Sequence, residues 1–179
     1  AQTMLQTQIK HTEEELTYLD TVFDALSRAQ SSTDLDEIRE ELERTGYATR
    51  KTQTKKTATR KQYHPMEFVT DEGYTVLCGK NNLQNEYITH TRADRHDWWF
   101  HVKNAPGAHV ILVTNGQEPD ALSFTQAATI AATYSGRGEG EAKHITVDYT
   151  QVHNLKKVPG AEHPRGRDGG EAGEENPQR

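Results

Sequence analysis

Cysteine and hydrophobic residues are both scarce in this chain of 179 residues. The single cysteine, Cys78, excludes an intramolecular disulfide and a cysteine-based zinc site, which fits a reducing compartment. Hydrophobic residues make up 32% of the chain, below the roughly 45–50% of a typical globular domain, so part of it should be solvated arm, linker or tail. No apolar run approaches the ~20 residues that cross a membrane, and no signal peptide is recognisable. We therefore expect a cytoplasmic location and no membrane partner.

Acidic residues predominate, but the charge is unevenly distributed. The net charge of −6 argues by itself against a nucleic-acid binder. Residues 46–66, however, contain six bases and no acid, between acidic blocks on either side. This basic run could lie along RNA phosphates and release counterions, or it could be a solvated linker that binds nothing specific. Its members are Arg50, Lys51, Lys55, Lys56, Arg60 and Lys61.

The first 46 residues are predicted to form two helices. Apolar residues recur every three or four positions over residues 5–30, at Leu5, Ile9, Leu16, Leu19, Phe23 and Leu26. A second helix should start at Thr33 or Asp34, because Thr33 with Asp36, or Asp34 with Glu37, has the spacing of a capping box. Gly46 should end it, since glycine enters the left-handed conformation cheaply. Both apolar faces are narrow, so we expect them to pack on a coiled-coil partner. The chain opens inside a helical pattern without an initiator methionine, so we expect a fragment of a longer protein.

Beyond the linker at 47–65, residues 66–160 are predicted to fold as one compact α+β domain. Strands are expected at 66–69, 74–78, 98–102, 109–113 and 145–149, with a further strand region at 152–155. An alanine-rich helix is expected at 123–134, packed closely on a sheet. Residues 79–85 are predicted as a polar turn, and 87–89 as a short strand or a helix start. Residues 161–179 should be disordered, since they contain no apolar side chain larger than alanine or proline.

Polar and aromatic residues cluster in two segments of this domain. Residues 79–87 contain adjacent asparagines, Asn81 and Asn82, which could contact RNA together with Lys80 or could simply close a turn through their own hydrogen bonds. Residues 97–110 contain both tryptophans and two histidines, His101 and His109, on either side of a Pro-Gly turn. A metal site on these histidines would need a third ligand such as His96 or Asp97. Two structural histidines, with no metal or other cofactor, are the favoured interpretation.

Adjacent tryptophans on a strand point to opposite faces. Trp98 shares a face with Phe100 and Val102, which makes it the better candidate for the core. Trp99 lies beside His101 and Lys103, a composition typical of a site that stacks on bases. Lys156 and Lys157, with Lys103, Arg92 and Arg95, could form a second positive patch if the fold gathers them.

These segments, with residues 147–161 and in this order, resemble the NFACT-R domain of the fibronectin-binding protein A / RqcH / NEMF family. The resemblance covers about residues 66–161, and residues 18–47 resemble the end of the family's coiled-coil arm. Two departures stand out. Residues 136–141 are more acidic than the basic segment usual there, and residues 162–170 cannot form the closing strands of relatives.

The resemblance implies an RNA- and ribosome-binding module without enzymatic activity. Its partners would be the large ribosomal subunit and tRNA, in the quality control pathway that adds C-terminal alanine tails to stalled nascent chains. The coiled-coil partner helix would come from a preceding part of the same protein. An extracellular fibronectin-binding adhesin is the alternative, and an enzyme or metal site on His96, Asp97, His101 and His109 is a weaker one. The predicted RNA-contacting residues are Arg50, Lys51, Lys55, Lys56, Arg60, Lys61, Lys80, Asn81, Asn82, Trp99, His101, Lys103, Lys156 and Lys157.

Overall fold

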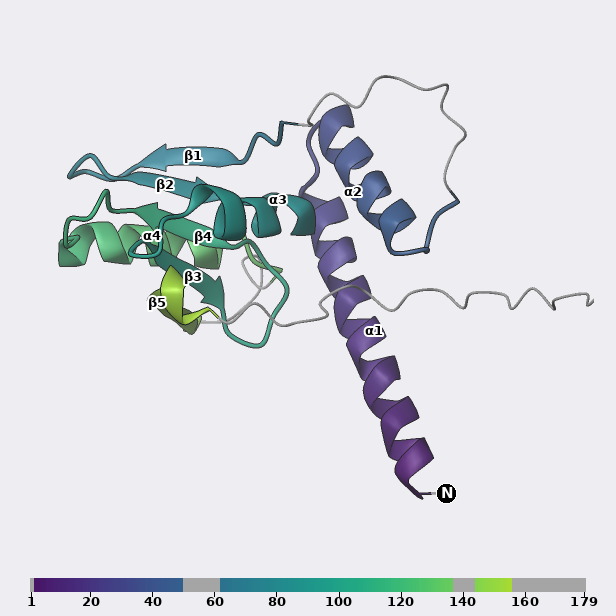
Figure 1. Ribbon diagram of the computed structural model, residues 1–179. Helices are drawn as coiled ribbons and strands as arrows, with labels where there is room; N and C mark the ends of the chain where they lie inside the picture. The colour runs from purple at the N-terminus through teal and green to yellow at the C-terminus, as the bar shows by residue number, and fades with distance from the viewer. Residues whose placement is uncertain (1, 50–61, 137–143, 156–179) are drawn as a thin grey trace, which may run out of the picture.

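A computed structural model describes residues 2–49, 62–136 and 144–155 of the chain. Figure 1 shows two parts, a long helical arm and a sheet domain that meets the arm near the end of its first helix. The predicted class, a helical segment followed by a mixed α and β domain, is confirmed.

The arm consists of α1 (Gln2–Arg28) and α2 (Ser32–Arg44). The predicted cap of α2 was wrong by two or three residues. Ser31 is the N-cap, its hydroxyl accepts a hydrogen bond from the Asp34 amide, and the Asp34 carboxylate accepts from the Ser31 amide in return. The predicted role of Gly46 is confirmed, because it has φ +82° and the next amide, that of Tyr47, donates to the Leu42 carbonyl.

The contact between α1 and α2 uses a different face of α1 from the predicted stripe. Val22, Ala25 and Ile38 are buried in this contact, with Tyr18, Ala29 and Leu42 around them. The stripe stays largely in solvent. Its exposed members are Leu5, Ile9, Leu16, Phe23 and Leu26, with exposed fractions from 41% to 71%.

The domain is built on a five-stranded antiparallel sheet in the order β1-β2-β4-β3-β5. Its strands are β1 (Met66–Val69), β2 (Thr75–Cys78), β3 (Trp98–Val102), β4 (Val110–Val113) and β5 (Val147–Gln151). The predicted strand at 152–155 is instead a single 3-10 turn, η2 (Val152–Asn154).

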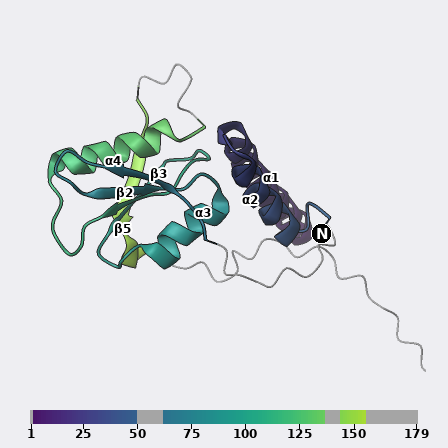
Figure 2. The same cartoon turned by 90° about the horizontal axis from the view of Figure 1, so that it is seen from above.

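Helices cover both faces of the sheet, as the view from above shows (Figure 2). The alanine-rich α4 (Ala121–Thr133) places Ala127 and Ala131 against Phe100 and its neighbours in β2 and β4. Alanines allow this close approach because they have no bulk beyond Cβ. The opposite face carries a second, smaller core of Leu77, Ile88 and Ile111.

The second face is covered by α3 (Asn82–Tyr87) and a π-helical turn, η1 (Ile88–Arg92). The sequence prediction of a polar turn over 79–85 was wrong for its second half, because Asn81 caps α3 by accepting from the Gln84 amide. Of the two alternatives for 87–89, the helical one is confirmed. The predicted disordered tail at 161–179 lies outside the described residues.

Candidate nucleic-acid interface

The structure describes six of the predicted RNA-contacting residues: Lys80, Asn81, Asn82, Trp99, His101 and Lys103. The other eight, Arg50, Lys51, Lys55, Lys56, Arg60, Lys61, Lys156 and Lys157, lie outside the described residues.

Two amide side chains at the start of α3 bind one carboxylate of the arm. Asn81 Nδ2 and Gln84 Nε2 donate to Glu37 Oε2, at 2.8 and 2.7 Å. All three residues are buried, at 1% exposure each. Since an unpaired buried carboxylate is costly, each of these groups depends on the others for a partner.

Two further contacts extend this junction on both sides. Asn82 Nδ2 donates to Glu41 Oε1 at 2.8 Å and to Thr21 Oγ1 at 2.7 Å. Lys80 Nζ lies 3.1 Å from Asp34 Oδ1. Burial opposes ionisation of Asp34, but hydrogen bonds from the Gln30 amide, the Lys80 ammonium and Ser31 outweigh it and lower the pKa of the carboxyl.

The arm and the domain therefore meet through polar groups. Among the described residues, each buried apolar cluster belongs wholly to the arm or wholly to the domain. Asp34, Glu37 and Glu41 on α2 face the amides and the lysine at residues 80–84. We withdraw Asn81 from the RNA-contacting set because its side chain is buried and engaged with Glu37. The side chains of Lys80 and Asn82 also contact the arm in this junction, at Asp34 for Lys80 and at Thr21 and Glu41 for Asn82.

Gly79, just before this junction, has no room for a side chain. A Cβ at this position would lie 2.1 Å from Asn85 Oδ1 and 2.9 Å from the Asn85 backbone nitrogen. The same Asn85 Oδ1 accepts from the His109 amide, and its Nδ2 donates to the Gly107 carbonyl. Asn85 thus ties α3 to the β3–β4 connection.

The two tryptophans point to opposite faces, as predicted. Trp98 packs on the α4 side, with its ring edge-on to Phe124 at 5.1 Å. Trp99 is half-buried beside Leu77, Ile88 and Ile111 in the second core. Its Nε1–H is buried and has no acceptor within the described residues. Because α3 and η1 cover this face, the structure gives Trp99 a packing role, and base stacking by it remains a prediction without structural support.

His101 and His109, on either side of the Pro-Gly turn, face each other with ring centroids 5.4 Å apart, and both rings contact Trp99. Burial lowers the pKa of both, that of His109 to about 3, helped by the neighbouring His101 and His90. His109 Nδ1 is 2.9 Å from Thr89 Oγ1.

The alternative metal ligands lie elsewhere. Asp97 accepts from the amides of Asp94 and Thr114. His96 packs near His153. Within the described residues, no three His, Cys, Asp or Glu side chains are grouped closely enough to hold a metal ion. Cys78 is buried, and burial raises the pKa of its thiol to about 12.

Two members of the conditional second positive patch, Lys103 and Arg95, are not brought together, and Lys156 and Lys157 lie outside the described residues. Lys103 follows the last residue of β3, whereas Arg95 precedes the first, so these two residues lie at opposite ends of the strand. His153, which no sequence pattern marks, joins Arg95 instead: its backbone amide donates to the Arg95 carbonyl at 3.1 Å. His153 and Arg95 are neighbours because β5 pairs with β3 and the turn η2 follows β5, so their proximity could be predicted only from that strand pairing.

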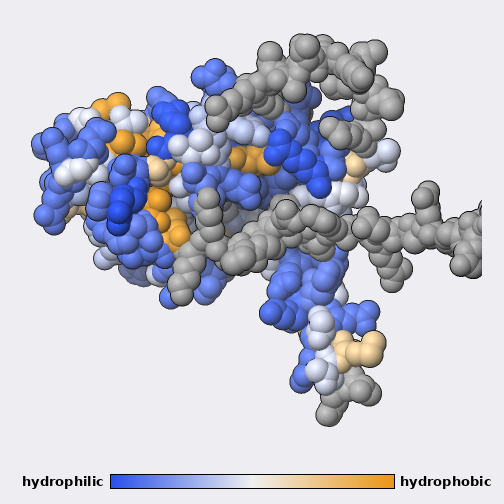
Figure 3. All heavy atoms as spheres, in the orientation of Figure 1, coloured by the Kyte–Doolittle hydropathy of each residue, from blue (hydrophilic) through white to orange (hydrophobic). Residues whose placement is uncertain are grey.

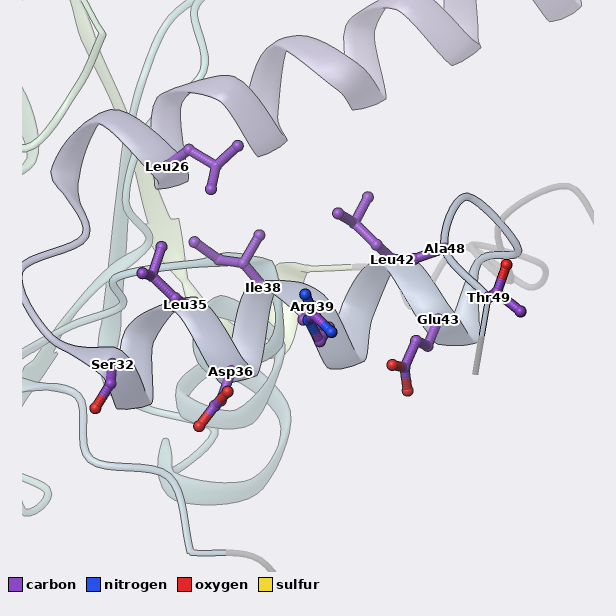
Figure 4. Close-up of a pocket in the computed structure, with 10 residues that line it drawn as sticks. All are labelled: Leu26, Ser32, Leu35, Asp36, Ile38, Arg39, Leu42, Glu43, Ala48 and Thr49. Atoms are coloured by element: carbon purple, nitrogen blue, oxygen red, sulfur yellow. The ribbon is translucent and has the colours of Figure 1, made fainter. Parts of the chain in front are cut away.

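Apolar side chains also line a groove in the arm. Figure 4 shows Leu26 of α1 across from Leu35, Ile38 and Leu42 of α2. The groove has a volume of about 850 Å³, and Arg39 and Glu43 are among its polar lining residues. Hydrophobic colour is otherwise sparse on the face shown in Figure 3 and is concentrated on the sheet domain. No helix in the described part of the chain is both long enough and apolar enough for a membrane span.

Residues 64–166 match the NFACT protein RNA binding domain, and residues 1–61 match the NFACT N-terminal and middle domains. The chain therefore belongs to the NFACT family.

Several curated relatives carry the name Rqc2 homolog RqcH, and two of them show the extent of the similarity. The one from Bacillus subtilis is 39% identical over 88% of this chain, and the one from Streptococcus suis is 36% identical over 85%. The chain spans only 27% and 26% of their lengths. A solved structure of the C-terminal of the fibronectin/fibrinogen-binding protein from Streptococcus suis superposes with a TM-score of 0.79. It is 34% identical, and the match covers 90% of this chain and 62% of that one.

Proposed function

We propose that this chain is the RNA- and ribosome-binding part of a ribosome-associated quality control factor. The observation that carries the proposal is the match of the whole sheet domain to the family's RNA binding domain, together with 36–39% identity to proteins named RqcH. In this proposal the complete protein acts in the cytoplasm, binds stalled large subunits with tRNA and promotes alanine tailing of the nascent chain.

The contribution of this chain would be contact rather than catalysis. Peptide bond formation would belong to the ribosome. Two side chains support this proposal: burial raises the pKa of the Cys78 thiol to about 12, and burial lowers the pKa of His109, whose Nδ1 lies 2.9 Å from Thr89 Oγ1. The basic run at 50–61 would supply contacts to RNA phosphates between arm and domain.

The exposed stripe of α1 would be covered by a helix from a preceding part of the same protein. Ile9, Leu16 and Phe23 recur every seven residues, and Leu19 and Leu26 each follow one of them by three positions, which is the spacing of a heptad seam. All but Leu19 are largely exposed. The groove beside Leu26 and Leu35 would lengthen this contact.

Binding to the host matrix is a second candidate function, favoured by one observation. The solved relative with a TM-score of 0.79 is described as a fibronectin/fibrinogen-binding protein. The same fold could present such a surface here.

Co-sedimentation with purified large ribosomal subunits tests the proposal, with binding to immobilised fibronectin measured in parallel. We expect subunit binding that weakens with salt. Replacing all six bases of the run by glutamine should flatten the salt dependence, by about 0.7 in log–log slope for each single-strand phosphate that is no longer neutralised. An unchanged slope would mean that the run is only a linker. Fibronectin binding without subunit binding would favour the second candidate.

A further inference from the structure

Strand β5 forms one edge of the sheet. It pairs with β3 alone, so its other side carries no strand among the described residues. Four residues of β5 and of the following turn η2 are exposed: Asp148, Tyr149, His153 and Asn154. A charged and aromatic surface on this edge would fit RNA, which combines a negative backbone with flat bases.

Tyr149 is the exposed aromatic residue of this edge. Its exposed fraction is 58%, and no other Phe, Tyr or Trp side chain in the described part of the domain is exposed to this degree. The ring is fixed from one side by Phe124, edge-on at 4.8 Å, and flanked by Trp98 and Phe100 at 6.0 and 6.2 Å. A ring held in this way loses little freedom when a base stacks on it. Tyr149 therefore has the exposed and fixed ring that base stacking requires, whereas Trp99 is half-buried in the second core.

A basic corner lies at the end of the same strand. The Val152 amide donates to the Asp97 carbonyl at 2.9 Å, and this turns η2 back toward the residues that precede β3. Arg95, His96 and His153 are consequently close together, and all are exposed. Arg95 makes no ion pair with any described residue, so its guanidinium is open to a phosphate.

Hydrogen bonding prepares His153 for the same role. Its Nδ1 lies 3.0 Å from the Arg95 carbonyl, which can only accept, so Nδ1 carries the proton. Nε2 is left for another partner, and it donates to a phosphate when the ring is protonated, since both nitrogens then carry a proton. The nearby Asp97 carboxylate is buried and bound to Thr114, which leaves Asp94 as the exposed acid of this corner.

We propose that single-stranded RNA lies along the outer edge of β5, with a base stacked on Tyr149 and phosphates held by Arg95 and His153. Tyr149 and His153 are four positions apart, which is at most roughly 13 Å at the rise of an extended strand and less here because His153 lies in the turn η2, a span that one short oligonucleotide can bridge. The inference rests on the proposed RNA-binding function and assigns its location. It differs from the prediction made from sequence patterns, which placed stacking on Trp99 and phosphate contacts on the basic run at 50–61, with Lys80 and Lys103 among the further RNA contacts.

The test uses the full chain, a labelled ten-nucleotide polyuridine strand and purified large subunits. Tyr149→Leu should weaken oligonucleotide binding about tenfold, at the lower end of what base–aromatic stacking contributes. Tyr149→Phe keeps the ring and should bind like wild type. The double variant Arg95→Gln with His153→Gln should flatten the salt dependence, whereas Arg39→Gln on the exposed side of α2 should not. Melting temperatures check that each variant is folded.

The outcomes separate the two proposals. If wild type binds the oligonucleotide and Tyr149→Leu binds both the oligonucleotide and the subunits equally well, the β5 edge is the wrong surface while RNA binding stands. If Tyr149→Leu weakens binding to subunits but not to the oligonucleotide, the edge contacts a ribosomal protein and the RNA assignment is overturned. If wild type binds neither, the proposed function itself fails.

Discussion

The sheet interior and the arm–domain junction both bury side chains completely, but the interior buries apolar side chains and the junction buries polar and charged ones. Inside the sheet, side chains such as Phe100 and Leu112 are fully buried among apolar neighbours. At the junction, Glu37 is just as buried but is surrounded by the amides of Asn81 and Gln84. Apolar packing stabilises without regard to direction, whereas a buried carboxylate requires its donors at fixed positions. The interior therefore supplies stability, and the junction specifies orientation.

Removing an interior ring should have the largest effect. Phe100→Ala leaves a cavity between α4 and the sheet and should lower the free energy of unfolding by about 3–5 kcal/mol. Urea denaturation followed by tryptophan fluorescence measures this value. Leu122→Ala, on the exposed face of the same helix α4, should cost well under about 1 kcal/mol. Similar values for the two variants would mean that the Phe100 ring is not part of the core.

Breaking the junction should change orientation more than stability. Glu37→Ala leaves Asn81 Nδ2 and Gln84 Nε2 without their acceptor, at a cost of about 1–3 kcal/mol for each group that stays buried. The junction should open to hydrate them.

Spin labels on cysteines introduced at Gln8 and Glu118 would report the distance between arm and domain, since the buried thiol of Cys78 should not react. The distribution should broaden in Glu37→Ala and stay narrow in Asp36→Ala, an exposed neighbour. A narrow distribution in both would show that other contacts fix the arm.

The histidine pair should make the domain sensitive to mild acid. The pKa of His109 is lowered in the folded chain, so the unfolded chain binds the proton more readily as pH falls below its usual 6.5. Stability should be complete above that pH and decline toward pH 3, by up to about 1.4 kcal/mol per pH unit. Replacement by glutamine, His109→Gln, should reduce the slope of stability against pH between about 6 and 4. An unchanged slope would assign the acid sensitivity to other groups.

The smallest effect is expected at the rim of the junction. Lys80 is partly exposed, so its pair with Asp34 should contribute no more than about 1 kcal/mol and should weaken with salt. In Lys80→Met the pKa of Asp34 should rise toward its usual range, while the amides of Gln30 and Ser31 still hold it lowered. Asp34 contributes stability above its ordinary pKa and loses it as pH falls through the folded value. NMR titration measures the change, and Lys10→Met, at an exposed pair, is the control.

Local patterns were enough to predict most of the fold. The strand Trp98–Val102, the alanine-rich helix and the glycine end of α2 each depend on residues close together in sequence. The opposite faces of Trp98 and Trp99 followed from the two-residue period of a strand.

The candidate site was harder to predict, because its residues are joined across long sequence distances. Asn81 looked like a turn residue with free donors, and its partner Glu37 lies 44 positions earlier. Nothing in either segment alone indicates the pairing. The same holds for His153, brought to Arg95 by strand pairing, and for the arm, whose buried face was the less apolar one.

Because α1 is long and contacts the domain near its C-terminal end, a small rotation at the junction would move its N-terminal end by a large distance. A straight helix of 27 residues extends roughly 40 Å, and the residues that touch the domain lie near its end at Thr21. A rotation of ten degrees about that fulcrum would therefore carry the far tip through about 5 Å, the height of one helical turn. A rearrangement of a single amide at Asn82 could be amplified in this way into a displacement large enough to engage or release whatever the tip touches.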